Sequence, residues 1–168
     1  MQGCTSERTV VLSGSCKVVD YITPEKISHF CDCEPLISGL GYNLVELSVF
    51  QRQSTWQIKI VITAPQGVGI ADCTKVHRAI FTRLEAVLAT QDLNIEVASP
   101  GLDRIFKNAY EFSVFTEKQV KVWNSDISDW MQGVIISSDT VSVRLRTEAG
   151  EITIPYNKIA KAKLFSQV

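Results

Sequence analysis

No apolar run in this sequence is long enough to cross a membrane, since stretches such as residues 58–62 are short and interrupted by charge. A strong charge of either sign is also missing, because 17 Lys and Arg residues stand against 18 Asp and Glu residues, a net charge of −1. Such a chain has no global field that would attract nucleic acid. Any contact with RNA must therefore come from local clusters of basic side chains.

Cysteine is present, but not in a pattern that forms disulfides or binds metal. The residues are odd in number and have no repeating spacing, which indicates reduced thiols in a cytoplasmic protein. On a helix, Cys31 and Cys33 would point about 200° apart and could not share one ion. We expect no metal and no cofactor, and interpret all the thiols as small apolar groups: Cys4, Cys16, Cys31, Cys33 and Cys73.

Catalytic motifs are missing as well, with no Gly-rich phosphate loop, no Gly-x-Ser-x-Gly turn and no His-Glu-x-x-His. Cys73 and His77 are four residues apart and would share one helix face, where a nucleophile pair is conceivable. The same face carries Val76, Ile80 and Leu84, which is typical of a packing stripe, and nothing visible orients the histidine. The sequence therefore predicts a protein that is not an enzyme.

Residues 1–22 are interpreted as an N-terminal extension that need not be ordered. Their weak apolar patch at 10–12 is too short for a signal peptide and has no net basic segment before it. Folded structure is expected from Thr23, where Thr-Pro-Glu favours the start of a helix. Helical spacing continues to a stop at Gly41, and Pro35 predicts a kink or a break within it.

An αββαβ domain is predicted for residues 23–100. Apolar alternation indicates strands at 44–50 and 56–63, and the polar loop between them favours an antiparallel hairpin. Asp72 is placed to cap a long amphipathic helix, and a third strand follows at 93–98. Both helices are expected on one face of the small sheet, which gives an α+β fold.

A second domain is predicted in the rest of the chain, with residues 101–117 as a junction containing a short helix and 118–168 as a small closed β-barrel. Short strands with tight turns between them favour such a barrel. They are expected at residues 119–123, 130–137, 141–147, 151–154 and 161–164. In the third strand, alternation predicts that Val141, Val143 and Leu145 line the core.

The densest unusual segment lies at the domain boundary and consists of Ser99, Pro100, Gly101, Leu102, Asp103 and Arg104. Pro followed by Gly favours a type II turn in which Gly101 takes a positive φ. Arg104 could form an ion pair across the junction, or it could meet a phosphate or carboxylate of a partner. The residues alone favour a rigid turn and leave a contact surface as the alternative.

Basic side chains near the C-terminus offer a second candidate site. Lys161 and Lys163 alternate with Ala162 and Leu164, so the two lysines share the outer face of the last strand. With two arginines of another strand they could form a basic patch on the barrel, made of Arg144, Arg146, Lys158, Lys161 and Lys163. Such charges are typical of a solvated surface, and RNA binding is the alternative.

The stretch Ile-Glu-Val-Ala-Ser-Pro-Gly-Leu-Asp-Arg at residues 95–104 resembles the signature of the ribosome maturation factor RimP family. Weaker pieces occur in family order within residues 24–165, at 40–45, 72–73, 133–135, 154–155 and 159–164. The resemblance implies an αββαβ domain joined to an Sm-like barrel. It also implies a cytoplasmic protein that catalyses no reaction and binds the free small ribosomal subunit, touching ribosomal RNA and a ribosomal protein near the decoding region.

We expect a monomer that has no membrane partner. The alternative to a subunit assembly factor is an Sm-like RNA-binding regulator of transcripts, which would bind naked single-stranded RNA tightly. The near-neutral charge of the chain argues against that alternative.

Three positions depart from the family pattern. Ile105 stands where a Pro often follows the motif arginine, and Glu117 stands where a Gly is usual before the first barrel strand. The loop before the second barrel strand carries Asp126 and Asp129, where many relatives have basic residues. The acidic loop shifts the expected RNA contact towards Arg104 and the lysines of the last strand.

Overall fold

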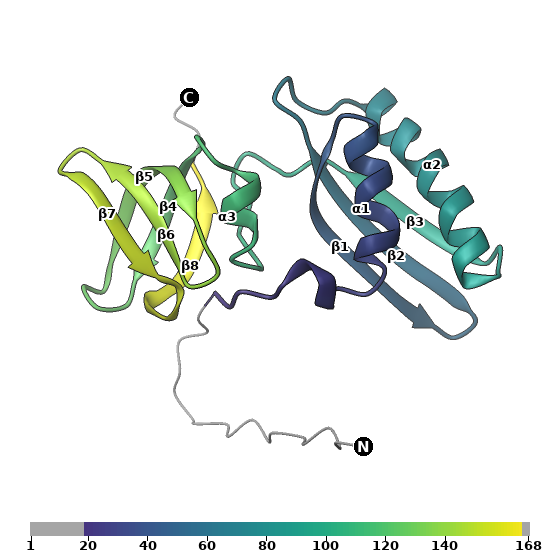
Figure 1. The fold of residues 1–168 in the computed structure, drawn as a ribbon, viewed down its shortest axis with the longest axis horizontal. Coiled ribbons are helices and arrows are strands. Elements are labelled where there is room, and N and C mark those ends of the chain that lie inside the picture. Colours follow the sequence, from purple (N-terminus) through teal and green to yellow (C-terminus); the bar gives the residue numbers. More distant parts are fainter. Residues whose placement is uncertain (1–18, 166–168) are drawn as a thin grey trace, which may run out of the picture.

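The computed structural model describes residues 19–165, which form two domains joined by a short segment (Figure 1). The N-terminal domain is a three-stranded sheet with two helices, and the C-terminal domain is a five-stranded sheet. Within residues 19–165 no helix is long and apolar enough to cross a membrane. The predicted α+β class, with an αββαβ domain followed by a small barrel-like domain, is confirmed.

The N-terminal sheet consists of β1 (Asn43–Arg52), β2 (Thr55–Thr63) and β3 (Leu93–Ala98), in the order β1-β2-β3. β1 and β2 form the predicted antiparallel hairpin, whereas β3 runs parallel to β2. A parallel pair needs a crossover connection, which α2 (Ile70–Leu88) supplies. Figure 1 shows α2 and α1 (Phe30–Gly39) together over one face of this sheet.

Alternation along β2 gives the sheet two different faces. Ile58, Ile60 and Ile62 are buried in the core that the helices cover. Val61 points the other way and is buried, with Val45 of β1, in the core of the C-terminal domain. The second face of the N-terminal sheet therefore meets the C-terminal domain directly.

The first helix starts later than the sequence pattern suggests. The signal at Thr23 produces only a short 3-10 helix at Pro24–Lys26, and α1 follows His29, whose φ of 61° is left-handed. A break at Pro35 is wrong, because α1 continues through that residue. Complete burial of Ile37 against the sheet offsets the amide hydrogen bond that the proline cannot make.

Asp72 caps α2 from inside its first turn. The helix has Gly69 as its N-cap residue, and the Gly69 N–H donates to the Asp72 carboxylate at 2.8 Å. The Tyr42 hydroxyl donates to the other carboxylate oxygen at 2.5 Å. These two hydrogen bonds hold the pKa of Asp72 below its ordinary value. The predicted capping residue therefore also ties the start of α2 to the segment before β1.

The C-terminal sheet has the order β7-β6-β5-β4-β8, with antiparallel neighbours throughout. Its strands are β4 (Gln119–Asn124), β5 (Asp129–Ser138), β6 (Ser142–Thr147), β7 (Gly150–Pro155) and β8 (Ile159–Leu164). A 3-10 helix at Tyr156–Lys158 leads from β7 into β8, and α3 (Glu111–Val114) precedes the sheet. Within residues 19–165 no ladder joins β7 to β8, so the predicted barrel is not closed by hydrogen bonds.

β6 shows where alternation predicts burial and where it does not. Val143 and Leu145 are fully buried, as predicted, but Val141 is 67% exposed. Val141 precedes the strand and lies in a turn, where its N–H donates to the Asp139 carboxylate at 2.7 Å. Gly133 of β5 allows β6 to approach closely, because a Cβ there would lie 2.9 Å from a β6 carbonyl oxygen.

The chain joins the two domains twice. Before entering the first domain, Val19 is buried in the core of the C-terminal domain, and its N–H donates to the Ile159 carbonyl at 2.9 Å. Ile22 and Asn108 then exchange two hydrogen bonds, of 2.9 and 3.0 Å. The expected N-terminal extension therefore includes a segment, residues 19–22, that packs on the second domain and the junction. Positions 1–18 of that extension lie outside the described residues.

Candidate functional site

The signature segment, residues 99–104, leaves β3 and turns into the junction without regular secondary structure. A type II turn centred on Pro100 and Gly101 is wrong, because Gly101 does not have a positive φ. The turn instead closes one residue later, where the Arg104 N–H donates to the Gly101 carbonyl at 3.2 Å. The anchored side chain of Arg104 accounts for this shift, since it fixes the last residue of the turn.

Arg104 points inwards and joins three separate segments of the chain. Its Nε and Nη2 donate to the two carboxylate oxygens of Glu111, at 2.7 and 2.9 Å. Nη2 also lies 2.9 Å from Oε2 of Glu46 on β1. The Arg104 side chain is 9% exposed and the Glu111 side chain 1%. Of the two alternatives for this arginine, the ion pair across the junction is the one that forms in the structure.

Lys107 completes this junction cluster, which consists of Glu46, Arg104, Lys107 and Glu111. Its Nζ donates to Oε1 of Glu46 at 2.8 Å, and its N–H donates to Glu111 at 3.0 Å. Burial of Glu46 acts to raise its pKa, but hydrogen bonds from Lys107 and Arg104 outweigh burial and lower it. Burial likewise opposes the charge of Arg104, yet Glu111 and Glu46 raise the pKa of its guanidinium. Glu46 and Arg104 are therefore both charged at neutral pH, and their ion pair holds β1 against the junction.

The other side of the signature is open to solvent. Leu102 is 72% exposed, and Gly101 and Asp103 are exposed beside it. With Pro65 of the β2–α2 loop and Leu164 of β8, Leu102 lines a cleft of about 640 Å³ between the domains. The signature therefore has an inner side that binds the two domains together and an outer side that a partner can reach.

The basic residues that the sequence singled out do not form one compact patch. Arg144 and Arg146 project from β6, and Lys161 and Lys163 from β8, opposite the buried residues that alternate with them. β5 and β4 separate these two pairs in the sheet. Lys158, in the 3-10 helix before β8, forms an ion pair with the acidic loop between β4 and β5. The four strand residues therefore share the outer face of the sheet but lie on different strands of it.

Sequence reasoning missed the residues that lie between those pairs. Lys121 and Trp123 of β4 alternate with the fully buried Val120 and Val122, so they lie on the outer face. Trp130 of β5 lies on the same face, directly opposite Trp123. The signal was present in the sequence, because the same alternation that placed Lys161 and Lys163 also applies to β4.

Cys73 and His77 do not show the geometry of a nucleophile pair. Both are half-buried on α2, and within residues 19–165 no hydrogen bond joins them. The His77 ring stacks on Phe81 with 6.4 Å between centroids and 18° between planes, an arrangement typical of packing.

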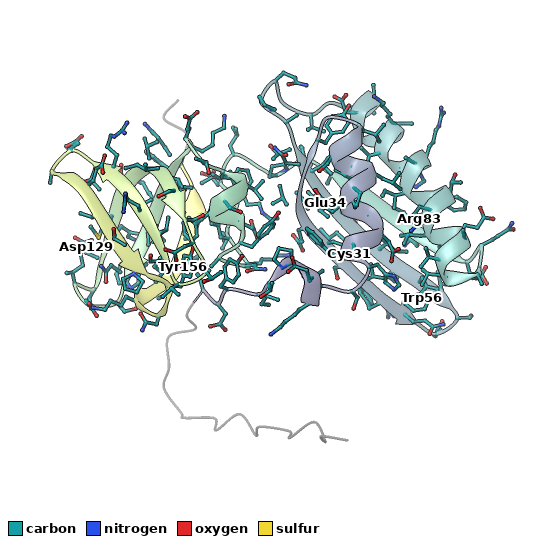
Figure 2. The ribbon with its side chains drawn as sticks, viewed as in Figure 1. Cys31, Glu34, Trp56, Arg83, Asp129 and Tyr156 are labelled. Carbon is teal, nitrogen blue, oxygen red and sulfur yellow. The ribbon has the colours of Figure 1, made fainter. Side chains whose placement is uncertain are left out.

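The thiols of α1 point to opposite sides of the helix, as their spacing predicts. Cys31 is exposed (Figure 2), whereas Cys33 is buried beneath the helix. Burial, with the nearby Asp32 carboxylate, raises the pKa of the Cys33 thiol to about 12. Cys33 is therefore a neutral, apolar part of the core at physiological pH.

Comparison with known proteins points to one family. The model of the RimP N-terminal domain matches residues 32–103, which end within the signature. The chain is 28% identical over 125 residues to the ribosome maturation factor RimP of Borrelia recurrentis, covering 74% of this chain and 85% of that protein. The RimP protein of Borrelia hermsii has the same identity and coverage. The RimP protein of Borrelia garinii subsp. bavariensis is 29% identical over 130 residues, covering 77% of this chain and 88% of that protein.

The likeness extends beyond the first domain, since an alignment of 125 residues cannot fit between residue 1 and the end of the signature at Arg104. Both the domain match and the relatives agree with the fold, in which an αββαβ domain leads through the signature into a small barrel-like sheet. The chain is similar to proteins of the RimP family across the first domain and into the second.

Proposed function

We propose that this protein assists the maturation of the small ribosomal subunit by binding the free subunit in the cytoplasm, and that it catalyses no reaction. The observation that carries the proposal is the family match at residues 32–103, which includes most of the signature. The proteins it resembles bear the name ribosome maturation factor. No finding favours the alternative of an Sm-like regulator of transcripts, and we do not propose it.

The proposed contact surface has two parts. Ribosomal RNA meets the basic residues of the outer barrel face, Arg144, Arg146, Lys161 and Lys163, with Lys158 at its edge. Lysine and arginine contacts to phosphate supply affinity without reading sequence, which suits binding to a folded RNA surface. A ribosomal protein meets the exposed side of the signature, where Leu102 offers an apolar side chain beside the interdomain cleft.

Arg104 has a different role in this proposal. Nε and Nη2 of its guanidinium are engaged by two carboxylates and its side chain is 9% exposed, so we assign it to holding the two parts of the surface together and not to RNA contact. Ser99, Pro100, Gly101 and Asp103 form the turn that carries Leu102 at the cleft. The protein acts as a monomer, and it needs neither a metal nor a cofactor for this binding role.

A strain that lacks the gene tests the proposal. Such a strain should accumulate immature small-subunit RNA, and a plasmid copy of the wild-type gene should restore maturation. A Lys161→Ala/Lys163→Ala copy should restore it only in part, because two phosphate contacts are lost. Lys75→Ala is the matched control, since Lys75 is an exposed lysine of α2, far from the barrel face, and should restore maturation fully. Normal subunit RNA in the deletion strain would contradict the proposal.

A further inference from the structure

The outer face of β8, β4 and β5 combines aromatic and basic side chains. On β4, Val120 and Val122 are fully buried in the core, so Lys121 and Trp123 face outwards. On β8, Ala162 is fully buried between Lys161 and Lys163. Neither Trp123 nor Trp130 belongs to either hydrophobic core, so neither is accounted for by burial inside the domain.

Strand register arranges these side chains in rows across the sheet. Lys161, Trp123 and Trp130 are direct neighbours on β8, β4 and β5. Two residues further along, Lys163 and Lys121 are neighbours, followed by Gln132 on β5. Adjacent strands are about 4.8 Å apart and adjacent rows about 6.7 Å apart. The indole pair and the lysines therefore occupy one continuous surface. We refer to Lys121, Trp123, Trp130, Lys161 and Lys163 as the tryptophan–lysine face.

The side chains of this face touch one another without covering the rings. Trp123 and Trp130 meet edge to face, with 5.6 Å between centroids and 77° between planes. The Lys163 ammonium lies 5.6 Å from the centre of the Trp130 ring, and Trp130 remains 37% exposed. The lysine therefore places a positive charge beside an aromatic surface that solvent can still reach.

Charge on the face is positive although the protein as a whole is slightly negative. Three lysines project from it, while Asp129 begins β5 and Asp126 lies in the loop before that strand. Lys158 pairs with Asp126 and neutralises it. Asp129, which immediately precedes Trp130, lies on the side of the barrel away from the N-terminal domain (Figure 2). The Trp130 end of the face therefore lies away from the N-terminal domain, whereas Lys163 at the other end pairs with Ile105, directly after the signature.

We propose that the tryptophan–lysine face binds an unpaired segment of RNA, with bases stacked on Trp123 and Trp130 and phosphates bound by Lys121, Lys161 and Lys163. Aromatic rings beside basic groups are what single strands require, because every base has a π-face and every nucleotide a phosphate. Paired RNA keeps its bases inside the helix and offers only its backbone and minor groove. This inference rests on the proposed function, for which it names the kind of RNA that the barrel recognises.

Titration with a single-stranded oligonucleotide of about 12 adenosines, at about 50 mM salt, tests the inference. Indole fluorescence should be quenched on binding, and the affinity should be modest, with a Kd of about 1–100 µM. Trp123→Ala and Trp130→Ala should each weaken binding about 5- to 100-fold, as loss of a stacked base requires. Trp130→Phe, which keeps an aromatic face, should retain most of the affinity.

Phe50→Ala is the matched control, because Phe50 is a 53% exposed aromatic residue of β1 in the other domain. It should leave binding unchanged, and circular dichroism should show that all variants are folded. A duplex of the same length should bind more weakly than the single strand. Unchanged binding by both Trp→Ala variants, or equal binding of duplex and single strand, overturns the inference.

Co-sedimentation of the same proteins with free small subunits separates this inference from the proposed function. If the wild type sediments with subunits while both Trp→Ala variants keep full affinity for the oligonucleotide, the inference fails and the proposed function stands. If those variants lose subunit binding but still bind the oligonucleotide normally, the face binds protein and the inference also fails. If the wild type binds the oligonucleotide through its tryptophans but never sediments with subunits, the proposed function fails alone.

Discussion

Nε and Nη2 of Arg104 donate to the two carboxylate oxygens of Glu111, at 2.7 and 2.9 Å, and Nη2 also lies 2.9 Å from Oε2 of Glu46 on β1. This pairing connects the end of the signature to α3 and to the sheet of the first domain. Together with Val19, which packs the incoming chain on the second domain, it restrains the angle between the domains at two points. The signature therefore acts as a structural joint whose exposed side carries Leu102.

Arg104→Ala should strongly destabilise the protein. The substitution leaves Glu111, 1% exposed, as an unpaired charge inside the junction, and breaking such a pair costs about 3–5 kcal/mol. Chemical denaturation should show this loss in the free energy of unfolding. Arg104→Lys keeps the charge but cannot make the bidentate contact, so its free energy of unfolding should lie between those of the wild type and Arg104→Ala. A loss below about 1 kcal/mol for Arg104→Ala would mean that the ion pair contributes little.

Acid should weaken the junction through Glu46. Its folded-state pKa is lowered by Lys107 and Arg104 below the ordinary value of 4.5, so its contribution to stability is fully present above that value. The contribution disappears as the pH falls through the lowered pKa. Between about pH 7 and about pH 3, the wild type should therefore lose more unfolding free energy than Glu46→Gln, which cannot titrate there. Equal losses for the two proteins would show that Glu46 is not coupled to folding.

Glu117→Gly should stabilise the protein. Glu117 has a φ of 69°, a left-handed conformation that glycine adopts without strain and other residues at a cost of about 1 kcal/mol. Its N–H also donates to the Ile135 carbonyl at 2.9 Å, which holds the residue in this conformation. Thermal or chemical unfolding should show a gain of about 1 kcal/mol. Glu117→Ala is the control, because it removes the side chain but keeps the strain, and a similar gain for it would refute this explanation.

Much of this fold could be predicted from the chain, because its strands alternate cleanly. The strand at 93–98 has the predicted bounds, and those of the barrel differ by one or two residues. The sequence-based predictions failed at positions where tertiary contacts determine burial or backbone conformation. Val141 looks like a core residue in the sequence, but an Asp139 turn places it outside the strand. Pro35 is tolerated inside α1 because that helix packs on the sheet.

The candidate site could be predicted only in part for the same reason. The signature was visible in the sequence, but its ion-pair partner Glu46 lies on a strand of the other domain, and nothing local connects the two. Glu111 is seven residues from Arg104 in sequence, and only the short α3 brings it within reach. Alternation placed Lys161 and Lys163 on the outer face and applies equally to Trp123, but only the pairing of β4 with β8 shows that Trp123 is next to Lys161.

Cys73→Ala should leave subunit binding and maturation unchanged. Cys73 is half-buried beside His77, whose ring is engaged by Phe81 rather than directed at the thiol. Replacing a half-buried thiol by a methyl group should cost no more than about 1 kcal/mol of stability. Complementation of the deletion strain, with expression level and thermal unfolding as controls, measures the outcome. Loss of maturation by a folded Cys73→Ala protein would point to chemistry at this thiol.

Co-sedimentation of the purified protein with ribosomal particles at low salt tests the central claim most directly. The protein should migrate with free small subunits, and it should remain at the top of the gradient when mixed with full ribosomes. Binding should weaken steeply as salt is raised, because lysines and arginines supply the contacts. Absence from the small-subunit fraction at low salt, or equal association with full ribosomes, would contradict the account.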